Sequence, residues 1–174
     1  MKFYTDLRLL LLSVWLGAAV FFIAVAQSAF AVLPQREMAG AVVGRTLIVL
    51  NFGGLAIFAL LFLTSFLGSA TVNRFWLWVE RILLLITATA CAVGQFVFGV
   101  WISLKHAEIG RPIDELAADD PLRIQFDMLH EYSVWTLIAG MAAALIVFFV
   151  IANRRSAKKA TSADPYNFEK EFKI

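Results

Sequence analysis

The sequence has few charged residues. Only 16% of its 174 residues are Asp, Glu, Lys or Arg, whereas an ordinary soluble domain has roughly a quarter. Hydrophobic residues make up 61% of the chain, and the mean hydropathy is +0.79. A chain this short has little interior in which to bury so much apolar surface. The excess must face lipid, so the composition predicts an integral membrane protein and excludes a soluble nucleotide-binding fold.

Cysteine and catalytic motifs are also scarce. Cys91 is the only cysteine, which excludes an intrachain disulfide and a secreted disulfide scaffold. The GxSxG, HExxH and Walker A patterns do not occur, so no common enzyme template applies. We therefore predict no catalytic residue and expect a non-enzymatic protein.

Four stretches are long enough to cross the hydrocarbon core, which takes about 20 helical residues. They run from Leu9 to Leu33, from Ala41 to Leu67, from Phe75 to Leu104 and from Val134 to Ala152. The fourth helix is expected to start earlier, near Leu122, because Asp120 and Pro121 are typical of a helix start. The predicted fold is all-α: an integral membrane four-helix bundle over residues 1–152, followed by a flexible cytoplasmic tail over residues 153–174.

The basic residues predict the orientation. They precede the first helix, flank the start of the third and follow the fourth: Lys2 and Arg8, Arg74 and Arg81, and Arg154, Arg155, Lys158 and Lys159. With four spans these regions share one side, which the positive-inside rule places in the cytoplasm. We expect a multi-pass protein of the cell inner (plasma) membrane with both termini cytoplasmic. The opposite side receives an acidic loop, which argues against a nucleic-acid partner.

A competing interpretation concerns the first helix. Lys2, the apolar run and Ala29-Phe30-Ala31 resemble a secretory signal with its cleavage site. The uncharged run from Leu9 to Ala26 is longer than the usual signal core of about 7 to 15 residues. We therefore expect a retained helix.

Small residues recur at helical spacing in all four spans. Membrane helices pack through such residues because they let backbones approach closely. We expect them to mark the inward faces of the bundle: Ser13, Gly17, Ala24 and Ser28; Gly40, Gly44, Gly53 and Gly54; Thr87, Cys91, Gln95 and Gly99; and Ser133, Gly140 and Ala144.

Polar residues inside the spans are costly and require a partner or a purpose. The group comprises Arg45, Asn51, Glu80, Arg81, Gln95 and Ser133, together with Gln27 and His130. Glu80 and Arg81 lie near the cytoplasmic interface, where they can pair with Arg8 and Asp6 or extend to water. Arg45 lies at about the depth of Asp127 and Glu131, which predicts an ion pair between helices.

The start of the fourth helix concentrates ionisable side chains. Imidazole binds transition metals and haem iron and carries protons near neutral pH. His130 and His106 are therefore the candidate cofactor ligands, with Asp127 and Glu131 as further metal ligands and haem or copper as the cofactors considered. The alternatives are a structural His130, hydrogen-bonded to a neighbouring helix, and proton or solute handling.

Three segments resemble a known family. They are Leu7-Arg8-Leu9 through Trp15-Leu16-Gly17 with Phe21-Phe22, the Ala39-Gly40-x3-Gly44 start of the second helix, and Phe126-x-x-Leu129-His130-x-x-Ser133. Together they are similar to the bacterial members of the uncharacterised four-helix family named for human transmembrane protein 205. Glu131 and Thr136 depart from the family pattern, which often has Gly and Asn there. The resemblance implies a membrane protein without a settled activity, distantly like membrane proteins of the copper-resistance D type and of the haem-using protoporphyrinogen oxidase type.

The sequence thus predicts a structural or accessory membrane subunit, with metal handling as one role it could serve. The first alternative is a haem- or copper-binding redox protein using His130 and His106. The second is a small transporter, which would have to oligomerise because four short-looped helices enclose little space. The expected partners are the lipid bilayer and a membrane protein or a second copy of the chain.

Overall fold

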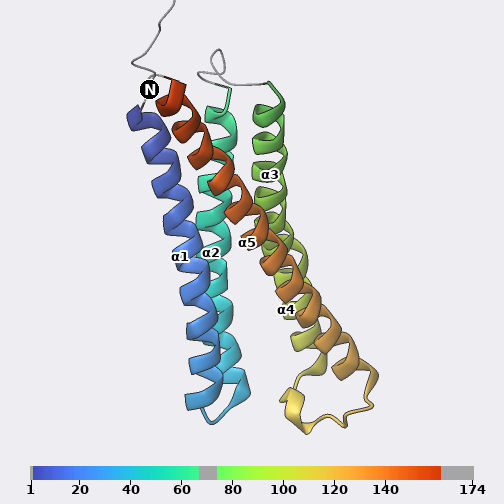
Figure 1. The fold of residues 1–174 in the computed structure, drawn as a ribbon. Coiled ribbons are helices and arrows are strands. Elements are labelled where there is room, and N and C mark those ends of the chain that lie inside the picture. The colour runs from blue at the N-terminus through green and yellow to red at the C-terminus, as the bar shows by residue number, and fades with distance from the viewer. Residues whose placement is uncertain (1, 67–73, 162–174) are drawn as a thin grey trace, which may run out of the picture.

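The computed structural model describes residues 2–66 and 74–161, with side chains described for residues 3–66 and 74–153. All regular structure in these ranges is helical (Figure 1). The elements are α1 (Lys2–Val32), α2 (Arg36–Thr64), α3 (Arg74–Val93), the π-helix η2 (Gly94–Phe98), α4 (Gly99–Ile109), the 3₁₀ turn η3 (Ile113–Glu115) and α5 (Pro121–Thr161).

The predicted number of spans is confirmed. Within the described residues, four helical segments are long and apolar enough to cross a membrane: Phe3–Val32, Arg36–Thr64, Arg74–Ile109 and Pro121–Asn153. The third consists of α3, η2 and α4 in one continuous run. Between 17% and 33% of the most apolar part of each span is buried, so most of that surface faces outward, as expected for helices in lipid.

Several helix boundaries differ from the predicted spans, most of all in α2 and α5. α2 begins at Arg36 rather than Ala41, because Gln35 is the extended residue before it, and it ends at Thr64. α5 continues through Thr161, past the predicted end at Ala152. Residues 153–161 contain no Gly or Pro and several good helix formers, so nothing in the sequence stops the helix there. The rest of the predicted tail, residues 162–174, lies outside the described residues.

The long helices pack in a ring, α1 on α2, α2 on α3, α3 on α5, and α5 back on α1. Figure 1 shows α5 crossing the bundle obliquely. We call the end that holds the N-terminus, the end of α2 and the start of α3 the terminus end. The opposite end, with the α1–α2 turn and the connection from α4 to α5, is the loop end. Figure 1 shows the start of α1 and the end of α5 at the same end of the bundle, as an even number of spans requires.

The hydrophobic core lies between the middle of the bundle and the terminus end. Leu12, Trp15 and Ala19 of α1 meet Phe58 and Leu61 of α2 there, together with buried residues of α3 and α5. The ring of Trp15 packs edge-on against Phe58 with centroids 4.8 Å apart. The buried residues of α5 all lie from its midpoint onward: Gly140, Ala143, Ala144, Val147, Val150 and Ile151.

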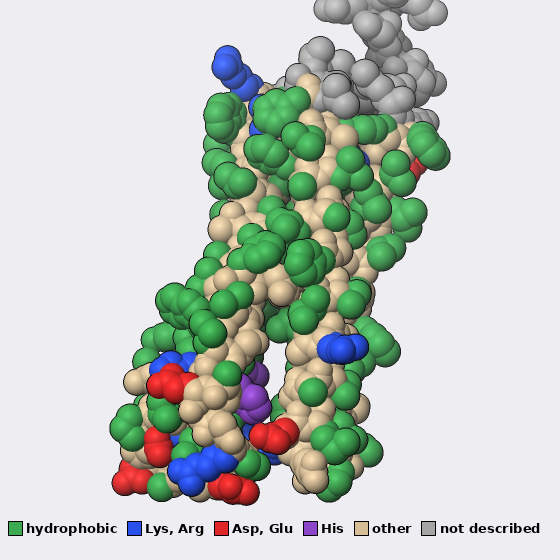
Figure 2. Space-filling view, turned by 180° about the vertical axis from the view of Figure 1, so that it is seen from behind, with side chains coloured by type: hydrophobic (Ala, Val, Ile, Leu, Met, Phe, Trp, Pro, Cys, Tyr) green, Lys and Arg blue, Asp and Glu red, His purple; other side chains and the backbone are tan. Residues whose placement is uncertain are grey.

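The bundle opens toward the loop end. No described residue of α5 before Gly140 is fully buried, and α4 packs mainly on α5 and η2 rather than on α1 or α2. Figure 2 shows the molecule hollowed between its two arms near this end, with histidine and acidic side chains beside the hollow. The closed half and the open half are the main asymmetry of the fold.

The small-residue prediction is confirmed for α3 and α5, is confirmed on α2 only at Gly54, and is wrong for α1. Thr87 and Cys91 of α3 and Gly140 and Ala144 of α5 are buried. The row on α1 is exposed along its whole length: Ser13, Gly17, Ala24 and Ser28. On α2, Gly54 is buried, but a side-chain carbon added at Gly40, Gly44 or Gly53 would meet no neighbour within 4 Å. α1 instead packs through larger residues, including Leu12, Trp15 and Phe22.

Candidate functional sites in the bundle

A buried ion pair closes the terminus end. Arg8 Nη1 lies 2.7 Å from Glu80 Oε1, with 10% of the Arg8 side chain and 0% of the Glu80 side chain exposed. Arg8 Nη2 also donates to the carbonyl oxygen of Leu61, at 2.9 Å. The pairing of Glu80 with Arg8 is one that the sequence predicts. It joins α1, α2 and α3, because each partner comes from a different helix.

Further polar contacts surround this pair at the end of α2. The Tyr4 hydroxyl donates to the carbonyl oxygen of Thr64. Arg81 donates from Nε to Ser65 Oγ and from Nη2 to the Ser65 carbonyl, both at 3.2 Å, and its guanidinium lies 4.1 Å from the centre of the Phe66 ring. The last carbonyls of a helix lack partners within the helix and carry partial negative charge. Tyr4 and Arg81 satisfy the carbonyls of Thr64 and Ser65, and Arg8 adds a second bond to the Leu61 carbonyl, which also accepts from the Ser65 N–H, so all three have a structural task.

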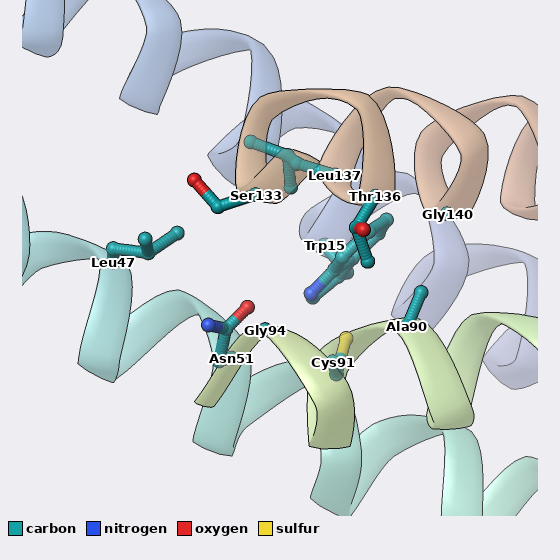
Figure 3. Close-up of a pocket in the computed structure, with 10 residues that line it drawn as sticks. All are labelled: Trp15, Leu47, Asn51, Ala90, Cys91, Gly94, Ser133, Thr136, Leu137 and Gly140. Atoms are coloured by element: carbon teal, nitrogen blue, oxygen red, sulfur yellow. The ribbon is translucent and has the colours of Figure 1, made fainter. Parts of the chain in front are cut away.

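A second polar site lies in the middle of the bundle, around Asn51. Its side chain faces a small cavity between α2, η2 and α5, with Trp15 of α1 on one side (Figure 3). The cavity holds about 20 Å³. Its lining includes Cys91, Gly94, Ser133 and Thr136, with Leu47, Ala90, Leu137 and Gly140 as the remaining residues.

Glycines shape this middle site. A side-chain carbon at Gly54 would lie 2.3 Å from Trp15 Nε1 and 2.8 Å from Cys91 Sγ, so only glycine fits between them. A carbon at Gly94 would lie 3.2 Å from Asn51 Nδ2. Gly94 opens the π-helix η2, and such single-turn π segments often accompany functional sites. The indole N–H of Trp15 donates to the Leu50 carbonyl at 3.3 Å.

The loop end carries ionisable side chains that are open to solvent. His106 Nε2 lies 3.7 Å from Glu37 Oε1, with 48% and 44% of the two side chains exposed. The His106 ring lies 6.5 Å from the Phe126 ring, centre to centre. An exposed ion pair joins Arg36 to Asp114 at 2.9 Å. Arg123 donates to the Leu116 carbonyl at 2.8 Å, which ties the start of α5 to the preceding loop.

The predicted metal ligands lie at this loop end but do not converge. His130, Asp127 and Glu131 are exposed on α5, while His106 is on α4. Glu131 Oε1 accepts from Trp135 Nε1 at 3.4 Å, and the His130 carbonyl accepts from Ser133 Oγ at 2.7 Å. Among the described residues, no three His, Cys, Asp or Glu side chains are close enough together to hold a metal ion.

The predicted ion pair of Arg45 with Asp127 or Glu131 does not form. Arg45 is exposed, and the structure records no ion pair between it and another described residue. Depth in the membrane was the basis of that prediction, and depth does not determine which way a side chain faces. Gln95 is half-buried in η2. Sequence reasoning also missed Trp15 and Thr136, although an indole in mid-span rather than at a span end was a signal for Trp15.

One comparison with known proteins identifies a family. Residues 10–108 match a family described as a domain of unknown function, DUF4149. The chain belongs to this family. The matched region covers more than half of the sequence and includes Asn51, Glu80 and Cys91, while α5, with His130 and Thr136, lies beyond it. No curated protein and no solved structure matches the chain.

Proposed function

We propose that this protein is a non-enzymatic accessory subunit of the cell inner membrane that packs α1 against a transmembrane helix of another protein. The supporting observation is the exposed small-residue face of α1, formed by Ser13, Gly17, Ala24 and Ser28. It lies opposite the face with Leu12, Trp15 and Ala19, which are buried in the bundle. Small residues favour helix association in lipid because they let two backbones approach closely.

A groove beside this face supports the same proposal. It has a volume of about 460 Å³ and lies between α1 and α2 toward the loop end. Its lining includes Ala24 and Ser28 of the small-residue face, together with Phe21, Val25, Ala29, Val32, Leu33 and Val42. The nearly apolar lining suits the side chains of a membrane helix, and Ser28 can add a hydrogen bond between helices.

The test is a cross-linking experiment in intact membranes. A photoreactive residue at Ala24 should form a cross-link to another protein, and Gly17→Leu should abolish it because the leucine keeps the backbones apart. Gly53→Leu on α2 is the matched control, because Gly53 also has open space around it but lies off the α1 face. Cross-links to lipid alone, or only to a second copy of this chain, would overturn the accessory-subunit proposal.

Metal handling is the second candidate, supported by the exposure of His106, His130, Asp127 and Glu131 at one end of the bundle. The described residues do not supply a complete ligand set, so an ion there would keep several water ligands. A metal-handling role is also what the distant resemblance to copper-resistance D type proteins and to haem-using membrane oxidases implies. Elemental analysis and an absorption spectrum of the purified protein test it, with His130→Ala and His106→Ala as the paired variants. A metal-free, colourless wild type would reject it.

The transporter alternative has less support. The cavity at Asn51 has room for about one water molecule, and the terminus end is closed by the Arg8–Glu80 pair. The resemblance to the family named for human transmembrane protein 205 is compatible with the accessory role, because it implies no settled biochemical activity.

A further inference from the structure

We propose that the cavity at Asn51 is a binding site for one internal water molecule, which joins α2 to α5 in the middle of the membrane. Only 4% of Asn51 is exposed, and its carboxamide makes no hydrogen bond to another described residue. A carboxamide has two donor hydrogens and an acceptor oxygen. Burying these groups without hydrogen-bond partners is costly, so the carboxamide calls for a hydrogen-bonding ligand.

The size of the cavity selects the ligand. A cavity holds one water molecule when about 10–15 Å³ is open to the centre of a water-sized sphere, and by that measure this cavity has about 20 Å³. That room excludes haem or an organic solute and leaves a molecule the size of water. On its loop-end side the lining is not fully buried, since Ser133 is half-buried there, while Gly140, farther along α5, is buried.

The hydrogen-bonding groups of the lining match water. Thr136 Oγ1 donates to the Tyr132 carbonyl at 2.8 Å, and Ser133 Oγ donates to the His130 carbonyl at 2.7 Å. Because both hydroxyl hydrogens are used within α5, their oxygens remain as acceptors for a ligand. Water donates to such an oxygen and accepts from the Asn51 amide, whereas an apolar occupant satisfies neither.

The neighbouring backbone accommodates this arrangement. Gly94 lines the cavity and leaves room beside Asn51 Nδ2 that a larger residue would fill. Trp15 Nε1 is already engaged by the Leu50 carbonyl, so the indole forms a wall of the site and need not supply a bond. Figure 3 shows Asn51, Trp15 and Cys91 around the same space.

X-ray hydroxyl-radical footprinting of the full protein in lipid nanodiscs tests the proposal, with water as the probe. Radicals formed from a bound water oxidise adjacent side chains, and both Trp15 and Cys91 are oxidisable and line the cavity. We expect oxidation of Trp15 although only 2% of it is exposed. Phe58 packs against Trp15 but is not part of the lining, so after correction for intrinsic reactivity it should be oxidised several-fold more slowly.

Two variants provide the control. Asn51→Leu removes the carboxamide at nearly constant volume and should reduce Trp15 oxidation several-fold, while oxidation of the exposed Trp101 stays unchanged. Thr136→Val removes one acceptor with little change of shape and should reduce Trp15 oxidation, though less than Asn51→Leu does. This second variant keeps the test valid if Asn51→Leu does not fold. Wild-type Trp15 oxidised no faster than Phe58, or unchanged oxidation in either folded variant, would overturn the proposal.

Discussion

Arg8 and Glu80 form an ion pair almost without solvent contact. Two charges taken out of water are stabilised only while both are present, so removing one partner leaves a charge with a large desolvation cost. The pair also reaches the last turn of α2 through the Leu61 carbonyl. The pair therefore helps to fix the positions of α1, α2 and α3 relative to one another.

We predict that Arg8→Ala lowers the free energy of unfolding by about 3–5 kcal/mol, because it removes one member of a buried pair. Arg36→Ala breaks the exposed pair with Asp114 and should cost less than about 1 kcal/mol. Unfolding in mixed detergent micelles, followed by circular dichroism, measures both. The double variant Arg8→Met with Glu80→Leu should regain most of the loss. Equal effects of Arg8→Ala and Arg36→Ala would contradict the structural role of the pair.

Gly54 and Gly53 are adjacent but lie in opposite surroundings. A side-chain carbon at Gly54 would collide with Trp15 and Cys91, whereas Gly53 has open space. Gly54→Ala should therefore destabilise the fold by about 1–3 kcal/mol, as overpacking does. Gly53→Ala should be neutral or stabilise it by up to about 1 kcal/mol, because alanine loses less backbone entropy in a helix. Thermal unfolding of both variants in detergent decides this, and equal melting temperatures would refute the packing argument.

Among the helices, α5 combines two environments. Between Gly140 and Ile151 it is packed in the core, whereas no residue of α5 before Gly140 is fully buried. Segments with few buried contacts open locally at lower free energy. α5 therefore runs from the open loop end into the closed terminus end, and its two halves should differ in how easily they open.

We predict that backbone amides of residues 122–133 exchange with deuterium at least about tenfold faster than those of residues 140–151, because local opening is easier where few contacts hold the helix. Hydrogen exchange with mass spectrometry in nanodiscs measures both segments of the same helix, which provides an internal control. Uniform protection along α5 would mean that a partner or lipid covers the first half as tightly as the bundle covers the second.

The sequence was sufficient for the four spans, because charge-free runs of that length admit few other structures. It also predicted an ion pair near the interface, with extension to water as the alternative, and the structure selects the Arg8–Glu80 pair. The inward face of α1 was assigned wrongly. In lipid both faces of a helix are apolar, so hydrophobic periodicity does not mark the buried one, and Trp15 packs inward while Gly17 does not.

The middle site was predicted only in part. Asn51, Cys91 and Ser133 were singled out as polar or small residues, but their convergence depends on how α2, α3 and α5 cross, which no local pattern encodes. The π-helix at Gly94–Phe98 likewise has no sequence signature that we recognise. The same holds for Arg45. Its depth in the span predicted a carboxylate partner, but the side on which its side chain lies depends on how α2 is rotated about its axis.

At the scale of the whole molecule, the two ends differ in charge as well as in packing. Arg8, Arg74 and Arg81 lie at the terminus end, where α5 also ends, with the basic residues 154, 155, 158 and 159 in its last turns. The loop end carries Asp114, Glu115 and Asp119 in its connection. Basic residues are retained on the cytoplasmic side during insertion, so the same asymmetry that closes one end predicts the orientation in the membrane.

We predict that alkaline phosphatase fused after Ile174 is inactive, because the enzyme folds only outside the cytoplasm, whereas a fluorescent reporter at that position is bright. Inserted at Ala118, an exposed residue of the loop end, alkaline phosphatase should be active. The two fusions control for each other's expression, because the same reporter is placed on opposite sides of the membrane in the same protein. Active alkaline phosphatase at Ile174 would contradict the predicted orientation. The loop end with His106 and His130 would then face the cytoplasm, and any metal bound there would have to come from cytoplasmic metal ions.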